Sequence, residues 1–228
     1  MNSTPVTDNV IQLTRMHFVN AFLVREDDGF TLVDTTFGGG AQQLIDAAAS
    51  AGGEIKRIAL THGHNDHVGS LDALKERLGG AQVFLSDLDA RIHAGEKVVD
   101  GKLPGWWPKS IKTVPDVPLS GGERIGSLEV IPTPGHSPGH VSFRDTRDNT
   151  VIAGDVFTTY GSAAVSNHFY WRFPLAAMAT WDKGKDLEAA RTLRALDPST
   201  LAVGHGPAVP QPASAMDAAI ARAAGKLG

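Results

Sequence analysis

The feature that most constrains this chain is a histidine-rich run that directly follows a short apolar segment. Residues 58–60 are Ile-Ala-Leu, and residues 61–69 read Thr-His-Gly-His-Asn-Asp-His-Val-Gly. Three imidazoles and one carboxylate fall within six positions, at His62, His64, Asp66 and His67. Neutral imidazole and carboxylate are the common protein ligands of zinc and similar divalent ions. The run therefore predicts a metal site on a loop at the end of a strand.

Length and composition bound the class of protein. The 228 residues, 42% of them hydrophobic, suit one domain or two small fused repeats. No low-complexity tract or linker divides the chain, so we expect a single domain over residues 1–228. The formal net charge of −4 gives no basic surface for nucleic acid.

The same composition bears on the compartment. The chain has no cysteine, which excludes disulfides and thiolate ligands and fits a reducing compartment. Residues 1–10 show no basic and apolar segments of a secretion signal. No stretch reaches the roughly 18 apolar residues that a membrane span needs. We therefore expect a cytoplasmic protein without a membrane partner.

Apolar runs and glycine or proline boundaries predict the order of the elements. In the first half we expect strands over 17–25, 30–34, 55–60 and 82–86, with helices over 41–51 and 68–78. In the second half we expect strands over 128–132, 141–145, 151–155 and 201–203, with helices over 181–196 and 213–224. Two proline-rich or aromatic stretches, 96–119 and 158–180, are predicted to be irregular. This alternation implies a layered α/β domain.

Three further polar positions follow predicted strands. Each lies beside glycine in the loop after a strand: His136, Asp155 and His205. Loops at the carboxyl ends of strands are where α/β sheets build their sites. The positions therefore are candidates to join the histidine-rich run in one centre.

Together these motifs resemble the metallo-β-lactamase superfamily. The resemblance rests on Asp34, the His62-x-His64-x-Asp66-His67 motif, and then His136, Asp155 and His205 in that order, and it spans residues 17 to 206. It implies a four-layer αββα sandwich with the metals at one edge of the two sheets. Within the family, the chain is most similar to small metallohydrolases and to the catalytic domains of lactonases and glyoxalase II enzymes.

The resemblance also implies a division of the ligands. His62, His64 and His136 would hold one divalent ion, Asp66, His67 and His205 would hold a second, and Asp155 would bridge the two. Zinc suits these ligands best, although iron, manganese and cobalt bind such sites too. A hydroxide bridging the ions would act as nucleophile at neutral pH, and Asp66 would serve as a proton shuttle.

Other residues would support this centre or shape its pocket. Asp34 and Thr61 are expected to orient ligands or water, and His140 to support rather than ligate. Two aromatic stretches could form a lid over the site or pack as core; their candidate pocket residues are Trp106, Trp107, Tyr160, His168, Phe169, Tyr170 and Trp171. The tryptophans are also compatible with a homodimer.

The expected function is hydrolysis of a small ester-like substrate, a lactone, ester or thioester. One departure concerns lactonases, many of which carry tyrosine three residues after the bridging aspartate, where this chain has Thr158. A mononuclear iron persulfide dioxygenase of the same fold is an alternative, and so is a phosphodiesterase. A non-catalytic metal-binding protein is a further alternative, which predicts no turnover by the metallated chain.

Overall fold

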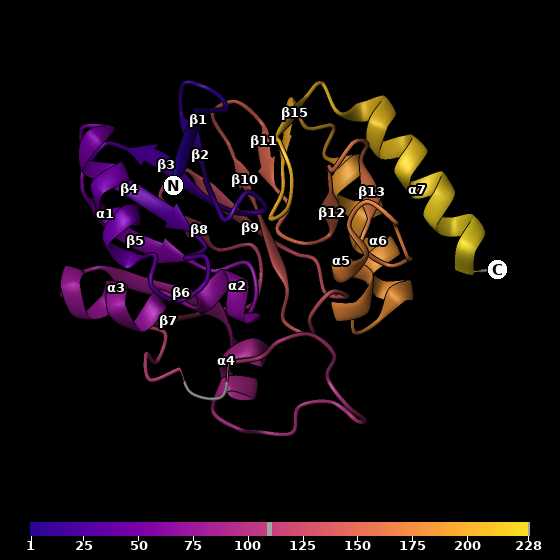
Figure 1. Ribbon diagram of the computed structural model, residues 1–228, viewed down its shortest axis with the longest axis horizontal. Coiled ribbons are helices and arrows are strands. Elements are labelled where there is room, and N and C mark those ends of the chain that lie inside the picture. The colour runs from indigo at the N-terminus through magenta and orange to yellow at the C-terminus, as the bar shows by residue number, and fades with distance from the viewer. Residues whose placement is uncertain (109–110, 228) are drawn as a thin grey trace.

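The first sheet is formed by the first half of the chain, as seen in the computed structural model, which describes residues 1–108 and 111–227 (Figure 1). Its first four strands pair antiparallel and its last four pair parallel. The strand order follows the sequence: β1 (Asn2–Pro5), β2 (Val10–Arg15), β3 (Val19–Glu26), β4 (Gly29–Val33), β5 (Ile55–Ala59), β6 (Gln82–Ser86) and β7 (Val117–Leu119).

The second sheet is formed by the second half. Its strands in spatial order are β15 (Val209–Pro210), β14 (Thr200–Ala202), β11 (Thr150–Ile152), β10 (Val141–Asp145), β9 (Leu128–Pro132) and β8 (Arg124–Ile125). Only β11 and β14 pair parallel within it. A small antiparallel ribbon, β12 (Phe157–Thr158) with β13 (Ala164–Val165), stands beside this sheet.

Helices cover the outer faces of the two sheets (Figure 1). The helices are α1 (Ala41–Ser50), α2 (Asn65–Val68), α3 (Leu71–Leu78), α4 (Asp87–His93), α5 (Pro174–Ala179), α6 (Lys183–Ala195) and α7 (Ala213–Leu227). In the described part of the chain, none of them is both long and apolar enough to cross a membrane.

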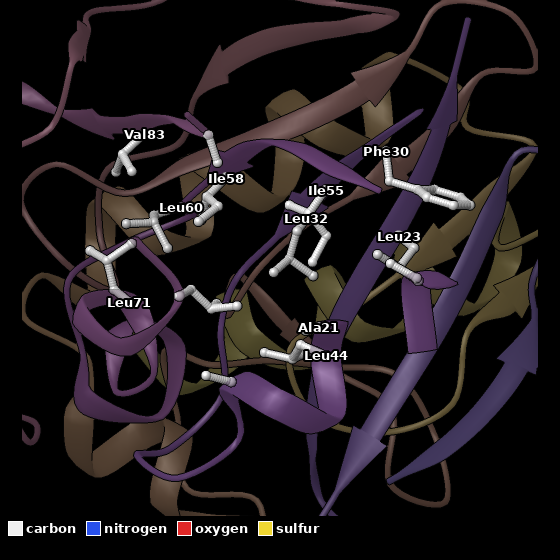
Figure 2. Close-up of a cluster of buried hydrophobic side chains, with 14 of the residues drawn as sticks. Ala21, Leu23, Phe30, Leu32, Leu44, Ile55, Ile58, Leu60, Leu71 and Val83 are labelled. Atoms are coloured by element: carbon white, nitrogen blue, oxygen red, sulfur yellow. The ribbon is translucent and has the colours of Figure 1, made fainter. Parts of the chain in front are cut away.

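Three buried apolar clusters define four layers. The outer face of the first sheet packs on α1 and α3 through residues such as Leu32, Leu44 and Leu71 (Figure 2). The facing sides of the sheets share Phe22, Phe84, Phe143 and their neighbours. The outer face of the second sheet packs on α6 and α7, with Leu193 and Met216 among the buried residues. Because each sheet buries both faces, the layers stack as helix, sheet, sheet and helix.

The structure confirms several predicted elements to the residue. The strands over 82–86, 128–132 and 141–145 form as expected, because apolar alternation there is bounded by glycine, proline or a polar turn. The helix expected over 68–78 is divided into α2 and α3 at Gly69 and Ser70. The Ser70 hydroxyl accepts a hydrogen bond from the Gly40 amide (2.9 Å) and donates to the Phe37 carbonyl (2.6 Å), which ties this break to the loop before α1.

Two stretches predicted to be irregular contain regular elements, and two strands were not predicted. The stretch 158–180 is not irregular throughout, since it contains part of β12, all of β13 and α5. The stretch 96–119 ends in β7, and part of it, residues 109–110, lies outside the described residues. The first sheet also has two strands, β1 and β2, before the first predicted one. These elements are short, and β1 is fully exposed, so pairing with neighbouring strands rather than a local pattern defines them.

Candidate metal centre

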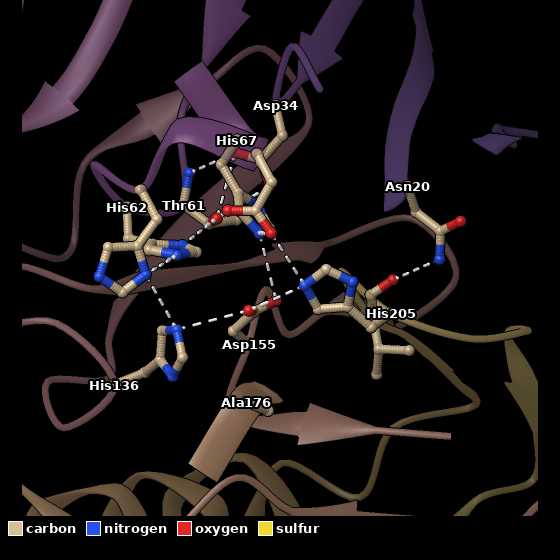
Figure 3. Close-up of polar contacts among 12 residues, drawn as sticks. Asn20, Asp34, Thr61, His62, His67, His136, Asp155, Ala176 and His205 are labelled. Carbon is tan, nitrogen blue, oxygen red and sulfur yellow. Dashed lines mark hydrogen bonds and ion pairs between the residues drawn. The ribbon is translucent and has the colours of Figure 1, made fainter. Parts of the chain in front are cut away.

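The histidine-rich run forms the loop that follows β5 together with the single turn of α2 (Figure 3). His62 and His64 precede α2, and Asp66 and His67 lie in its single turn. The His64 carbonyl accepts hydrogen bonds from the amides of His67 (2.9 Å) and Val68 (3.0 Å). This turn points the side chains of the run toward one place, where His136, Asp155 and His205 arrive from the second sheet.

Three ring nitrogens converge in the first group of candidate ligands. The Nδ1 atom of His64 lies 3.0 Å from Nε2 of His62 and 3.1 Å from Nε2 of His136. All three side chains are buried. Nitrogens bound tetrahedrally to one zinc ion lie roughly 3.3 Å apart, given bonds of about 2.0–2.1 Å. The spacing therefore fits a single shared ion.

Asp66, His67 and His205 form the second group. The Asp66 Oδ2 atom lies 3.3 Å from Nε2 of His205 and 3.7 Å from Nε2 of His67. His67 and His205 are buried, whereas Asp66 is partly exposed and borders the cavity above the centre. The group combines two imidazoles and one carboxylate, a set that zinc and iron both accept.

Asp155 lies between the two groups. Its Oδ2 atom is 3.4 Å from Nε2 of His136 and 3.1 Å from Nε2 of His205, so a single carboxylate oxygen faces both. The other oxygen, Oδ1, is 3.4 Å from Nε2 of His67, yet neither of these buried atoms makes a hydrogen bond. Buried polar atoms are rarely left without a partner. These two orphaned atoms fit ligands that await a metal ion.

The glycine before His205 permits this close packing. A Cβ atom on Gly204 would lie 2.1 Å from Oδ1 of Asp155 and 2.8 Å from Cε1 of His67. No side chain larger than hydrogen fits there without moving one of the two candidate ligands. Glycine at this position therefore belongs to the construction of the centre.

The two groups differ in charge. Burial lowers the pKa values of His62 and His136 well below their ordinary range and that of His64 to about 4, so the first group is neutral. In the second group burial opposes protonation, but the carboxylates of Asp155 and Asp66 raise the pKa of His205 to about 10. A divalent ion binding to the second group would therefore displace the proton that the two carboxylates otherwise stabilise on His205.

Hydrogen bonds on the far side of the ligands fix their orientation. Asp34 accepts bonds from Nδ1 of His67 (2.8 Å) and from the Thr61 amide (2.8 Å) and hydroxyl (2.8 Å). Since the Thr61 hydroxyl donates to Asp34, its oxygen accepts from Nδ1 of His62 at 3.0 Å. The Nε2 atoms of both histidines are thereby left free to face the centre. Asp34 has a φ of 62°, a costly conformation for a residue other than glycine.

The ligands from the second sheet are supported in the same way. His136 Nδ1 donates to the Thr180 hydroxyl (3.0 Å), and His205 Nδ1 donates to the Phe18 carbonyl (2.7 Å). His140 lies behind the centre, where its Nε2 accepts the Asp155 amide proton (3.1 Å). Asp34, Thr61 and His140, which the sequence predicted to support the centre, therefore contact the candidate ligands and do not face the space where an ion would bind.

One supporting residue escaped the sequence analysis. Asp89, fully buried in α4, accepts hydrogen bonds from the Gly63 amide (2.8 Å), the Ser137 hydroxyl (2.7 Å) and the Gly139 amide (2.8 Å). It thus joins the loop of His62 and His64 to the loop of His136. Burial raises the pKa of its carboxyl to about 6. The only signal for it is the Ser86-x-x-Asp89 spacing, which also describes an ordinary helix start.

A cavity of about 150 Å³ opens above the centre. Of the predicted pocket residues, Trp106 lines it, and Trp107 packs edge-on against His64 with ring centroids 4.9 Å apart. Tyr160 stacks on Phe173, which lines the cavity, and its hydroxyl donates to the His17 carbonyl at 2.9 Å. The remaining walls come from residues that were not predicted: Phe18, Phe37, Phe173, Leu175, Ala176, Met178 and Ala179.

Four predicted pocket residues lie away from this cavity. Tyr170 donates its hydroxyl proton to the Tyr160 carbonyl (2.8 Å), and Trp171 stacks with Arg172. Phe169 and Trp171 are exposed, and His168 bonds its neighbour Asn167. The aromatic residues 168–171, which suggested a lid, therefore lie in a surface loop. The helix that follows them, α5, lines the cavity instead.

Comparisons with known proteins agree with this geometry. The sequence pattern of one family, described as the metallo-beta-lactamase superfamily, matches residues 14–205. The chain is 43% identical over 210 residues to YobT of Bacillus subtilis, an uncharacterized protein, covering 90% of each. It is 29% identical over 147 residues to the hydroxyacylglutathione hydrolase GloC of Haemophilus influenzae, covering 60% of this chain and 66% of that protein. The crystal structure of TTHA1623 in a di-iron-bound form matches with a TM-score of 0.67 at 28% identity, covering 90% of this chain and 95% of that one.

Proposed function

Because the chain belongs to the metallo-beta-lactamase superfamily, we propose that it is a dinuclear metal-dependent hydrolase of an ester-like substrate, a lactone, ester or thioester. One observation carries the proposal. The Asp155 carboxylate faces a three-histidine group and a second group of two histidines and an aspartate at once. Two ions side by side are the arrangement that such a shared carboxylate serves.

The residues of the chain have distinct parts in this reaction. Divalent ions in such a site, when bound, lower the pKa of water to about 7 and polarise the oxygen of the substrate. His62, His64 and His136 would hold the first ion, Asp66, His67 and His205 would hold the second, and Asp155 would serve both. Asp66 borders the cavity, so its carboxylate can take a proton from the attacking water and deliver it to the leaving oxygen.

An iron-dependent oxidoreductase, such as a persulfide dioxygenase with one iron, is the second candidate. It is favoured by the three-histidine group, which can hold one ion without the second group. The structure of TTHA1623, 28% identical to this chain, was obtained in a di-iron-bound form, which supports iron as the metal but two ions rather than one. Metal content and oxygen consumption distinguish the two candidates.

The proposal is tested by elemental analysis of the purified protein, joined to a hydrolysis screen over lactones, esters, thioesters and phosphodiesters. We expect two ions per chain and turnover of a carboxylic ester or lactone. His64→Ala and Asp66→Ala should abolish turnover and lower the metal content, whereas the surface control His17→Ala should retain both. One iron per chain, with oxygen consumed on glutathione persulfide, would overturn the hydrolase proposal.

A further inference from the structure

We infer that the substrate carries an uncharged apolar chain, which lies between Trp106 and helix α5 and leaves the cavity over Leu175 and Met178. The inference rests on the proposed hydrolase function and specifies its substrate class. It follows from the walls of the cavity, from the charges that line it, and from the way both walls are attached to the metal ligands.

Helix α5 presents one apolar face to the cavity. Leu175, Ala176, Met178 and Ala179 all line it, and their spacing is that of a single helical face. Leu175 is 40% exposed and Met178 is 70% exposed. Single exposed apolar side chains are common on protein surfaces, but a group of them beside a cavity is typical of a ligand-binding groove. A chain that extends out of the cavity would cover both.

Trp106 lines the same cavity from the loop after α4 and is 65% exposed. Its backbone is held in place, because the Asn65 amide donates to the Trp106 carbonyl at 2.8 Å. The residue before it, Gly105, has a φ of 85°, and a Cβ atom there would lie 2.4 Å from Nε2 of His64. The backbone at Gly105 and Trp106 therefore packs directly against the candidate ligand His64, which fixes the position of Trp106 beside the cavity.

Phenyl rings form the inner end of the cavity. Phe173 lies 4.6 Å from the His205 ring, measured between centroids, and Phe18 lies 6.4 Å from Phe173. Phe37 adjoins Phe18 at 6.1 Å. Apart from the candidate metal ligands, the side chains that line the cavity are therefore aromatic or aliphatic.

Charge is distributed in the same way. Over residues 1–108 and 111–227, the titratable side chains that line the cavity are all candidate ligands: His64, Asp66, His136, Asp155 and His205. The guanidinium of Arg15 is engaged with the carbonyls of Phe37 (2.6 Å) and Gly38 (3.0 Å), and that of Arg172 stacks on Trp171. Among these described residues no lysine or arginine lines the cavity, so a substrate with carboxylates, such as a glutathione thioester, has no such side chain to pair with at the cavity walls.

Both walls are fastened to ligand-bearing loops. The Thr180 hydroxyl, which follows α5, shares its single proton between the Ser166 and Ala176 carbonyls while accepting from Nδ1 of His136. The Trp106 loop is fastened to Asn65 beside His64. An apolar chain held between these walls is therefore placed in a fixed register with the reacting bond, which makes α5 and Trp106 determinants of specificity.

The test is a series of p-nitrophenyl esters, from acetate to octanoate, with the metal-loaded protein. Full burial of a methylene group is worth about 0.8 kcal/mol, or about fourfold in kcat/KM. Because the walls are open on one side, we expect about half of that free energy, so kcat/KM should rise about twofold for each added methylene. Leu175→Ser and Met178→Ser should lower kcat/KM for octanoate about fivefold to tenfold and flatten the series. The matched control is Leu88→Ser in α4, which is 38% exposed and away from the cavity and should leave the series unchanged.

A binding measurement separates this inference from the hydrolase proposal. Octanamide, which resists hydrolysis, should bind at least tenfold more tightly than butanamide, read from tryptophan fluorescence. Hydrolysis with no dependence on chain length would overturn the inference and leave the hydrolase proposal standing. If protein with two ions hydrolyses no lactone, ester or thioester, the hydrolase proposal falls. Octanamide binding no tighter than butanamide would overturn the inference as well.

Discussion

The candidate metal centre below the cavity, which forms its floor, and the apolar side chains of Leu175, Met178 and Trp106, which form its wall, are stabilised in different ways. On the floor, His62, His67 and His136 are buried, and each donates its outer ring nitrogen to a defined acceptor. On the wall, Leu175, Met178 and Trp106 are exposed and contribute apolar surface. The orientation of the imidazole rings on the floor depends on single hydrogen bonds, each of which one substitution can remove. The contribution of the wall depends on the apolar surface area that it offers to a substrate. Changes on the floor should therefore act on metal and turnover, and changes on the wall on substrate choice.

The largest effect is expected at the shared carboxylate. Asp155→Asn keeps the shape of the side chain and removes the charge that faces both groups. We expect kcat/KM to fall by about 10³-fold or more, with at least one ion lost, as measured by steady-state kinetics and elemental analysis. Retention of two ions with turnover within tenfold of the unmodified protein would break the distinction between floor and wall.

The next largest effect is expected at Asp34, which does not face the ions but orients a candidate ligand. Asp34→Asn weakens the bonds to His67 and Thr61 without touching the space between the ligands. Supporting residues of this kind are worth about 10–100-fold in metal affinity, which competition with a chelator measures. Asp28→Asn, which removes an exposed ion pair with Arg57, is the control and should change affinity less than about twofold.

Substitution of Asp89 tests whether the hydrogen bonds below the metal centre also contribute to the stability of the fold. Asp89→Ala leaves the amides of Gly63 and Gly139 without their acceptor, which should cost about 2–4 kcal/mol in the free energy of unfolding. Urea unfolding of both proteins measures it. A loss below about 0.5 kcal/mol would show that the two ligand loops hold their positions without this carboxylate.

The pH dependence of the same residue follows from its raised pKa. Because burial raises the pKa of Asp89 from 3.8 to about 6, the native state binds a proton more readily than the unfolded state. Its contribution to stability is therefore largest below about pH 4 and declines as pH rises through about 6, by up to about 3 kcal/mol. Asp89→Asn should lack this part of the pH dependence, as urea unfolding between pH 4 and 7.5 would reveal. Parallel curves for the two proteins would contradict it.

The smallest effect is expected at Tyr160. Its hydroxyl bonds the His17 carbonyl, and its ring stacks on Phe173 with centroids 5.2 Å apart. Tyr160→Phe keeps the stacking, so kcat/KM should stay within about twofold. A loss of tenfold or more on a lactone would mean that this hydroxyl turns toward the substrate, in the manner expected of lactonases.

The same contrast explains what the sequence could predict. His62, His64, Asp66 and His67 stand in one short motif, and His136, Asp155 and His205 each follow a strand beside glycine, so their convergence could be inferred before any coordinates. Asp89 could not, because its three donors come from two distant loops. The wall could not either, since α5 has only six residues and Phe18 and Phe37 stand in no recognisable pattern. Aromatic composition pointed instead to residues 168–171, which the fold directs elsewhere.

The division of the ligands between the two sheets has a consequence for the lifetime of the protein. The histidine-rich run follows β5 in one sheet, while His136, Asp155 and His205 follow β9, β11 and β14 in the other. Ions held between them would cross-link the two halves of the sandwich, and separating the sheets would require releasing them. Saturation at a hundred times the dissociation constant adds about 2.7 kcal/mol to such a closed state. Metal supply would then govern not only turnover but also how often the chain opens to proteases.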